Sequence, residues 1–210
     1  MMNALVFGSG GGSNFKAIFS CIKSGKINLN ISCVISNNSG SGILSFADEN
    51  ELDAFHLSQL KLPNKSDYEQ EYHNLLEKYN PDIIILAGYM KMIPVSIIQK
   101  MEHKILNIHP SLLPSFGGEG MYGMNVHEAV KNAGVKISGA SVHFVTEVYD
   151  EGPIVLQSSV ELSGEESAEE IASLVLNIEH QLYPEAVEIV VNGDFTIENN
   201  QVILLDRENT

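Results

Sequence analysis

Short apolar runs alternate with amphipathic segments over the first half of the chain. Brief apolar runs are typical of strands buried on both faces of a sheet, whereas apolar residues at helical spacing indicate the helices between them. The pattern predicts strands at 4–7, 29–35, 54–57, 82–86 and 105–109, and helices at about 15–24, 43–51 and 66–79. This alternation predicts a parallel, doubly wound, Rossmann-like sheet with helices on both of its faces.

Two details of this half follow from single segments. The strand at 82–86 is the most hydrophobic of the chain, which predicts a place at the centre of the sheet. Ser66 is expected to cap the helix that runs to Tyr79, because Glu69 stands three residues later, as in a capping box.

The second half follows a different pattern. A strand at 138–145, a turn at 146–153 and a strand at 154–160 predict an antiparallel hairpin. A long helix is expected over 167–191, kinked or restarted at Tyr183-Pro184, and a closing hairpin over 195–205. The predicted fold class is therefore α/β, with a mostly parallel sheet and an antiparallel C-terminal part. A length of 210 residues favours a single domain.

Charge and cysteines limit the partners and the compartment. With 27 acidic against 12 basic residues the formal net charge is −15, which opposes nucleic-acid binding because clustered Lys and Arg hold phosphate backbones. Met1–Ala4 carries no basic leader segment, and no apolar run approaches the roughly 18 residues of a membrane span. Cys21 and Cys33 lack metal-ligand spacing and indicate free thiols in a reducing compartment. We expect a cytoplasmic protein that binds no nucleic acid, membrane or metal.

A glycine-rich loop, Gly8–Asn14, follows the first strand and precedes the first helix. Glycines let the backbone approach an anion, and the N–H groups at a helix start point at it, so the loop predicts a phosphate cradle. A dinucleotide site would need a glycine where Ser13 stands and an acid about 20 residues later, but no Asp or Glu occurs between Phe15 and Ala47. No Gly-Lys-Ser/Thr follows either, so the NAD and P-loop interpretations weaken. The interpretation that this loop is a glycine turn required only by packing stays open.

A polar pair ends the fifth strand. Alternation directs Asn107 and His109 to one side of this strand, and Pro110 ends the pairing. An amide donor beside a group that titrates near neutral pH suits the stabilisation of an oxyanion. From the residues alone, a catalytic and a structural role for His109 stay equally open. His143 is a candidate for supporting the site from a later strand. The remaining histidines considered are interpreted as surface or structural residues: His56, His73, His103 and His127.

Ligands of open α/β sheets collect beyond the carboxyl ends of the strands. We therefore expect three loops to define one cleft: Gly8–Asn14, Gly88–Ile93 and Asn107–Pro110. The glycine-rich run 111–124 predicts a mobile loop over this cleft, followed by a short helix at 126–132.

Three segments carry a resemblance to a known family: Asn107-Ile108-His109-Pro110-Ser111-Leu112-Leu113-Pro114, Ser141–Val145 with Asp150–Pro153, and Gly10–Asn14. From about Asn3 to Val191 the chain resembles the phosphoribosylglycinamide formyltransferases of the formyl-folate transferase superfamily. The segment Glu179–Pro184 and the glycine loop are more specific to this member of the superfamily. The resemblance implies one domain with a nucleotide-phosphate half at about 1–100, a folate and catalytic half at about 101–192, and a C-terminal hairpin and tail at 193–210.

The resemblance also implies the activity and the residues that perform it. A formyl group would pass from the co-substrate 10-formyltetrahydrofolate to the amino group of glycinamide ribonucleotide, in de novo purine biosynthesis and without a metal. Asn107 and a protonated His109 would stabilise the oxyanion, and Asp150 would raise the histidine pKa and assist proton transfer. The implied nucleotide-binding residues are Gly12, Ser13, Asn14, Met90, Ile108, Pro110 and Glu179. The implied folate-binding residues are Lys91, Met92, Ile93, Asn107, Val145, Thr146, Glu147 and Asp150.

Two residues depart from the family's pattern. Lys91 stands where many members carry Arg, which replaces a planar bidentate carboxylate clamp by a point charge. Gly11 stands where Asn is common.

Rival functions stay open at this point. A methionyl-tRNA formyltransferase would need a nucleic-acid domain, a formyltetrahydrofolate hydrolase would usually carry an amino-terminal regulatory domain, and a sugar-nucleotide formyltransferase would have no reason for the glycine loop. A module that only binds a phosphate ligand or folate would have no use for Asn107, His109 and Asp150 together. The expected partners are the two small-molecule substrates, with a monomer or a homodimer as the assembly.

Overall fold

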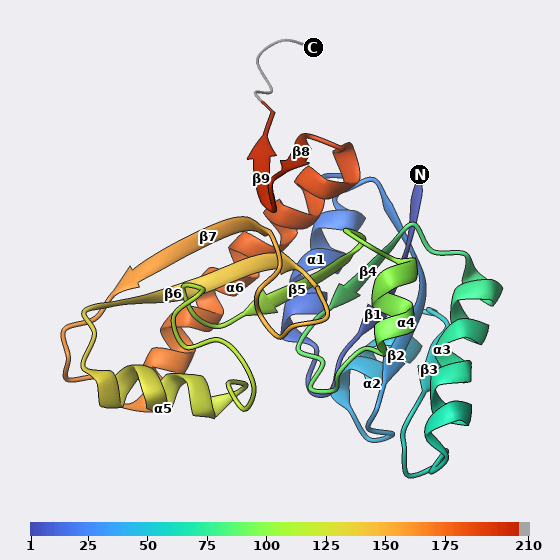
Figure 1. Ribbon diagram of the computed structural model, residues 1–210, viewed down its shortest axis with the longest axis horizontal. Helices are drawn as coiled ribbons and strands as arrows, with labels where there is room; N and C mark the ends of the chain where they lie inside the picture. The colour runs from blue at the N-terminus through green and yellow to red at the C-terminus, as the bar shows by residue number, and fades with distance from the viewer. Residues whose placement is uncertain (206–210) are drawn as a thin grey trace. The chain divides into compact units, whose positions relative to one another are not determined.

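The computed structural model describes residues 1–205, and the chain divides into an N-terminal unit, residues 1–106, and a C-terminal unit that begins at Asn107 (Figure 1). The elements up to the boundary are β1 (Met2–Phe7), α1 (Ser13–Lys23), β2 (Leu29–Ser36), α2 (Gly42–Glu49), β3 (Ala54–His56), α3 (Lys65–Tyr79), β4 (Ile83–Leu86), α4 (Val95–Lys100) and β5 (Ile105–His109), which crosses it. The C-terminal unit continues with α5 (Met124–Ala133), β6 (Ile137–Phe144), β7 (Ile154–Glu161), α6 (Ala168–Asn192), β8 (Phe195–Glu198) and β9 (Gln201–Leu204).

The strand order of the seven-stranded sheet is β3-β2-β1-β4-β5-β6-β7, and β8 pairs with β9 in a separate sheet. β4 is the middle strand of this order, and its four residues are all buried, as the hydrophobic run at 82–86 predicted. β1 pairs in parallel with β2 and β4, whereas β6 and β7 are antiparallel. The predicted fold class, mostly parallel α/β with an antiparallel C-terminal part, is confirmed.

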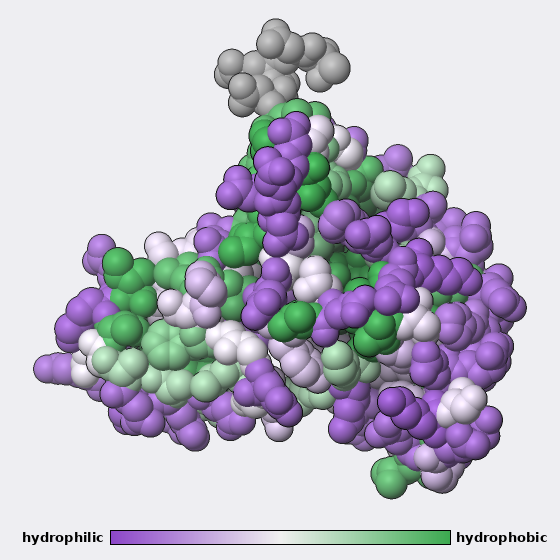
Figure 2. Space-filling view, in the orientation of Figure 1, coloured by the Kyte–Doolittle hydropathy of each residue, from purple (hydrophilic) through white to green (hydrophobic). Residues whose placement is uncertain are grey.

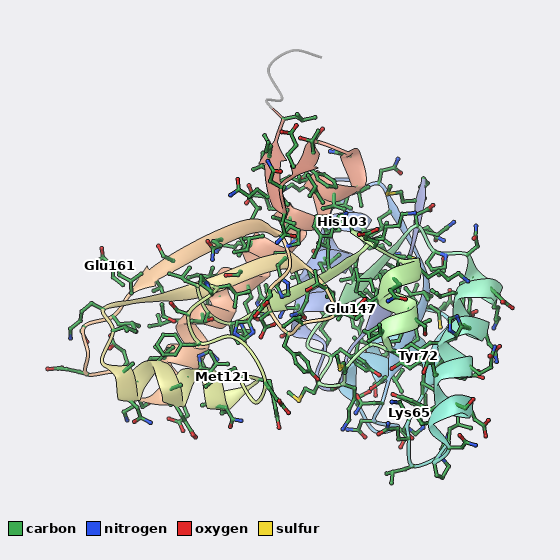
Figure 3. The ribbon with its side chains drawn as sticks, viewed as in Figure 1. Lys65, Tyr72, His103, Met121, Glu147 and Glu161 are labelled. Carbon is green, nitrogen blue, oxygen red and sulfur yellow. The ribbon has the colours of Figure 1, made fainter. Side chains whose placement is uncertain are left out.

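Aromatic contacts show which helices cover which face of the sheet in the N-terminal unit. Phe15 of α1 meets Phe46 of α2 edge-on, with ring centroids 5.7 Å apart, so these two helices share a face. Phe7 of β1 stacks on Tyr72 of α3 at 5.7 Å, and Figure 3 shows Tyr72 on the inner side of this helix. Right-handed crossovers put α3 on the face opposite to α1, because the chain reverses its direction across the sheet after β3. The outer side of α3 is hydrophilic (Figure 2).

Both ends of the antiparallel part follow the sequence pattern. β6 and β7 form the expected hairpin, with a shift of register between Val142 and His143. β8 and β9 form the closing hairpin, in which Asn199 and Asn200 hold φ angles of 51° and 63°. Positive φ at both central residues is the property of the tight hairpin turn that asparagine favours. The predicted tail beyond the hairpin includes residues 206–210, which lie outside the described residues.

Two helix predictions were wrong. α3 begins one residue before Ser66, because Asn64 is the N-cap and its side chain accepts from the N–H of Ser66 at 2.9 Å. Glu69 instead accepts a hydrogen bond from the hydroxyl of Ser96, so the predicted capping box does not form. No helix was predicted at 95–100, where α4 is too short to show a period.

The long helix α6 begins with a real capping box and does not restart. Ser167 accepts from the N–H of Glu170 at 3.1 Å, and the Glu170 carboxylate accepts from the N–H of Ser167 at 2.7 Å. Pro184 lies inside the helix and is buried with Tyr183. The expected restart at Tyr183-Pro184 is therefore wrong, because the helix continues through the proline. In the part of the chain that the structure describes, no helix is both long and apolar enough to cross a membrane.

Candidate functional site

The glycine loop of the N-terminal unit, Gly8–Asn14, leads from β1 into α1. Gly12 is the N-cap of α1 with a φ of 72°, and a Cβ at this position would lie 2.8 Å from Cγ1 of Ile43. Only glycine tolerates both the left-handed backbone and this close approach. Gly10 and Gly11 border open space, because a Cβ on either would meet nothing within 4 Å. The start of α1 therefore offers backbone N–H groups and room for an anion.

Ser9 joins the glycine loop to the loop that follows β4. Its N–H donates to the carbonyl of Gly88 at 3.0 Å, and its hydroxyl accepts from the N–H of Met90 at 2.8 Å. The same hydroxyl donates to Oδ1 of Asn37 at 2.6 Å. Asn37 follows β2, where dinucleotide-binding folds carry the ribose-binding acid. The structure thus brings together two of the three expected loops, Gly8–Asn14 and Gly88–Ile93. At the position where a dinucleotide site would need an acid for the ribose, it places the side-chain amide of Asn37, which is bonded to Ser9.

The polar pair of β5 meets the hairpin of β6 and β7 in the C-terminal unit. Nδ2 of Asn107 lies 3.1 Å from Nε2 of His143, and Nδ1 of His109 lies 3.4 Å from Oδ2 of Asp150. Oδ1 of Asp150 lies 3.6 Å from Nε2 of His143. The three residues expected at a catalytic centre therefore lie together, with His143 as a fourth member. We call Asn107, His109, His143 and Asp150 the polar network.

Backbone groups of the segment after β5 complete the polar network. Nε2 of His109 donates to the carbonyl of Phe116 at 2.8 Å, and the N–H of Gly118 donates to Oδ2 of Asp150 at 2.9 Å. Phe116 and Asp150 hold φ angles of 55° and 57°, in the region that disfavours residues with a Cβ. Such strained residues concentrate at functional sites.

Ser141 of β6 fixes the first part of the same segment. Its buried hydroxyl donates to the carbonyl of Ser111 at 2.7 Å and accepts from the N–H of Leu113 at 2.9 Å. Gln157 of β7 donates to the carbonyl of Leu113 at 3.0 Å. The predicted loop 111–124 is thus bonded to the site over 111–118, and only its later part, which includes Met121, leads away to α5 (Figure 3).

Burial decides the charge states in the polar network. Burial lowers the pKa of His109, and the Asp150 carboxylate and the Phe116 carbonyl only partly oppose this effect. Burial raises the pKa of Asp150, but the neighbouring His143, His109 and Gly118 N–H outweigh it, so the pKa of this carboxyl lies below its ordinary value. Asp150 is therefore ionised and His109 neutral at pH 7. The prediction that Asp150 raises the pKa of His109 is right for that single contribution and wrong for the sum, because the sequence does not show how deeply the ring is buried.

The residues implied for the nucleotide differ in exposure. Met90 is 55% exposed, Asn14 and Ile108 are buried, and Pro110 is half-buried. Glu179 is only 7% exposed on α6, although its position in a helix alone would suggest a surface acid. A buried carboxylate needs partners or a function, which makes Glu179 more than a solvated helix residue.

The residues implied for folate also lie in loops. Lys91 and Met92 are exposed after β4, and Ile93 is buried. Val145 and Thr146 are half-buried after β6, and Glu147 is exposed in the loop toward β7 (Figure 3). Within residues 1–205, no three His, Cys, Asp or Glu side chains form a group that could hold a metal ion.

Sequence reasoning gave too little weight to three partners of this site. His143 was only a supporting candidate, although its alternation with Ser141 on a strand and the nearby Gly152-Pro153 bend were signals for it. The Phe116 carbonyl and the Gly118 N–H had no signal, because backbone groups of an aperiodic loop have no pattern in the sequence.

The comparisons of this chain with known proteins agree on one family. A family model described as formyl transferase matches residues 2–187. A phosphoribosylglycinamide formyltransferase of Vigna unguiculata, named as chloroplastic, is 42% identical over 205 residues, which cover 97% of this chain and 66% of the relative. The chain therefore spans slightly less than two thirds of that plant protein.

Two solved structures share the fold. The crystal structure of glycinamide ribonucleotide transformylase 1 from Symbiobacterium toebii has a TM-score of 0.90 and 35% identity, and the match covers 98% of this chain and 95% of that one. A formyltetrahydrofolate deformylase from Pseudomonas syringae pv. tomato has a TM-score of 0.88 and 25% identity, and the match covers 98% of this chain and 66% of that one.

Proposed function

The chain belongs to the formyl transferase family, and we propose that it transfers a formyl group from 10-formyltetrahydrofolate to the amino group of glycinamide ribonucleotide, a step of de novo purine biosynthesis. The observation that carries this proposal is the polar network, in which an amide, two imidazoles and a carboxylate meet at the end of β5. Two relatives are named for this transfer, the Vigna formyltransferase and the Symbiobacterium transformylase, and their names support the choice of substrates.

The N-terminal unit would bind the phosphate of the acceptor. The N–H groups at the start of α1 attract an anion through the helix dipole, and Gly12, Ser13 and Asn14 present this helix start. With a net charge of −15, the protein offers no general attraction to a phosphate, so a local backbone site is required. Met90, Ile108 and Pro110 would contact the glycinamide arm, and Glu179 would accept from the ribose hydroxyls.

The polar network fits a formyl donor, because it offers N–H groups for a developing oxyanion and a base for a proton. Bound 10-formyltetrahydrofolate would supply the formyl group on a nitrogen. Lys91, Met92 and Ile93 in one loop, and Val145, Thr146 and Glu147 in another, would hold it together with Asn107 and Asp150. Lys91 would meet the glutamate tail as a point charge.

Each side chain of the implied trio has a role that follows from its charge state. Asn107 would donate an amide N–H to the formyl oxygen as negative charge builds on it. His109, neutral before the reaction, would take the proton that the attacking amine releases, and the resulting imidazolium would stabilise the oxyanion. Asp150, already ionised, would stabilise that imidazolium and assist the passage of the proton to the folate nitrogen that leaves.

A hydrolase that releases formate is the second candidate, because the Pseudomonas deformylase shares the fold. The glycine loop favours the transferase, since water as the acceptor would need no phosphate site. A module that only binds ligands would not require His109 and Asp150 to face each other.

One assay separates the three functions. The protein is mixed with 10-formyltetrahydrofolate, with and without glycinamide ribonucleotide, and free tetrahydrofolate is followed by absorbance. Release that depends on the nucleotide supports the transferase. Release without it indicates the hydrolase, and no release with either mixture indicates a binding module.

The proposal also covers location and assembly. We propose a cytoplasmic location because both cysteines are free and no helix of residues 1–205 could span a membrane. A monomer or a homodimer stays a prediction.

A further inference from the structure

His143 is the buried member of the polar network that the proposed reaction does not use. Its side chain lies on β6 and is 2% exposed, between Asn107 and Asp150. The register of β6 against β7 shifts between Val142 and His143, and such irregularities re-aim side chains next to active sites. The position of the ring is therefore built into the hairpin.

The hydrogen bonds of the ring fix its tautomer. Nδ1 of His143 lies 2.9 Å from the carbonyl of Phe144, and a carbonyl only accepts, so Nδ1 carries a hydrogen. Gly152 leaves room for this carbonyl, because a Cβ at residue 152 would collide with the oxygen of Phe144. In a neutral ring, Nε2 is then left as an acceptor.

The acceptor at Nε2 faces Asn107. The distance of 3.1 Å to Nδ2 of Asn107 is a hydrogen bond, whereas the distance of 3.6 Å to Oδ1 of Asp150 is too long for one. The side-chain amide of Asn107 has two N–H groups, so one is used by His143 and the other remains for a ligand. Without this bond the carboxamide could rotate and present its oxygen to the developing oxyanion, which would repel it.

We infer that His143 is a positioning residue, which accepts a hydrogen bond from the side-chain amide of Asn107 at Nε2 and so orients this amide toward the formyl oxygen. This inference rests on the proposed function for its kinetic consequence, but the orientation itself does not depend on any activity. His109 and Asp150 are the titratable groups that face the ring. Nε2 lies nearer to Nδ2 of Asn107, at 3.1 Å, than to Oδ1 of Asp150, at 3.6 Å.

The kinetic test compares two variants at the same site. His143→Leu removes the acceptor, and His143→Gln keeps one, because the oxygen of glutamine reaches nearly the position of Nε2. Loss of a group that orients another typically costs about 10- to 100-fold, and we expect this loss in kcat for His143→Leu, with an unchanged KM for glycinamide ribonucleotide. His143→Gln should recover most of the kcat. Equal values for both variants, or a loss confined to KM, would overturn the inference.

A spectroscopic test works without turnover. Nitrogen NMR of protein labelled in histidine and asparagine should show His143 protonated at Nδ1 and unprotonated at Nε2, the minority tautomer of neutral imidazole in water. One amide proton of Asn107 should also shift in His143→Gln relative to wild type. Protonation at Nε2 of wild-type His143 overturns the inference even if His143→Leu does not fold. If the spectra show the expected tautomer but the protein transfers no formyl group, only the proposed function is overturned.

Discussion

In the proposed function, the glycine loop and the polar network would stabilise negative charge in opposite ways. The loop Gly8–Asn14 presents backbone N–H groups at the start of α1. Its chemistry therefore comes from the backbone, and it needs glycine because a side chain would block access to these groups. The polar network uses side chains whose polar atoms face one another at distances of 3.1–3.6 Å, so each residue type matters. A phosphate has a permanent charge and needs attraction only. A formyl oxygen becomes charged during the reaction and needs groups that respond by proton transfer.

The largest effect should come from the polar network. His109→Ala would remove the proposed base and the proposed charged partner of the oxyanion, and loss of one such group typically costs about 10²- to 10³-fold in kcat. Binding of glycinamide ribonucleotide, measured by calorimetry, should stay within a few fold because the glycine loop is untouched. His73→Ala is the matched control, since His73 bonds to Ser96 in the N-terminal unit and should leave kcat unchanged. A near-normal kcat for His109→Ala would remove this residue from the mechanism.

Asp150→Asn should have a smaller effect on rate and a clear effect on pH dependence. The carboxylate opposes the burial that lowers the pKa of His109, so its removal lets that pKa fall further. The acidic limb of the profile of kcat/KM against pH should move to lower pH, with a drop in kcat of about 10- to 100-fold. Measurement from pH 5 to 8 tests this, and an unmoved limb would show that Asp150 only positions the ring.

Gly12→Ala tests the other side of the comparison, because it should change binding and leave the polar network intact. Alanine at a φ of 72° costs roughly 1–2 kcal/mol, and its Cβ would press on Ile43. We expect an affinity for glycinamide ribonucleotide about tenfold weaker, at an almost unchanged kcat. Gly40→Ala is the control, since its backbone does not lie in the left-handed region and a Cβ there meets only Asn38 at 3.9 Å. Unchanged affinity in Gly12→Ala would place the phosphate elsewhere.

The two regions also differ in how far the sequence predicts them. The glycine loop is contiguous, so its glycines, the strand before it and the helix after it are all visible in one short stretch of sequence. The polar network joins β5 to residues 34 to 43 positions later, and only Asn107 and His109 are adjacent in the pattern. Alternation predicted which way these two point and made His143 a supporting candidate, but the contact of His143 with Asn107 depends on tertiary packing that no local pattern encodes.

The failures have the same physical origin. Ser66 and Glu69 match a capping box as well as Ser167 and Glu170 do, yet Glu69 has a competing partner in Ser96, from a distant segment. The predicted effect of Asp150 on the pKa of His109 has the right direction, but burial outweighs it; the charge next to His109 can be inferred from a motif, whereas its burial results from the packing of the whole unit. Local preferences are readable from the sequence, and tertiary competition is not.

The smallest expected effect concerns stability, and it should separate the two regions once more. The pKa of His109 is lowered, so between its folded pKa and about 6.5 the unfolded chain binds more protons than the folded protein. The free energy of unfolding is therefore fully developed above about pH 6.5 and decreases as the pH falls below it, by about 1 kcal/mol for each unit by which the pKa is lowered.

Buried His127 contributes to this decrease with the same sign, because its pKa is also lowered. A second decrease should begin below about pH 3.9, where Asp150 takes up a proton in the unfolded chain while its lowered pKa keeps it ionised in the folded protein. Urea unfolding at pH 7.5 and 5.5 measures the first decrease, which should shrink in His109→Gln and persist in Gly12→Ala. The same pH dependence in both variants would show that the ionisable groups of the polar network do not couple to folding, and that other histidines cause the loss.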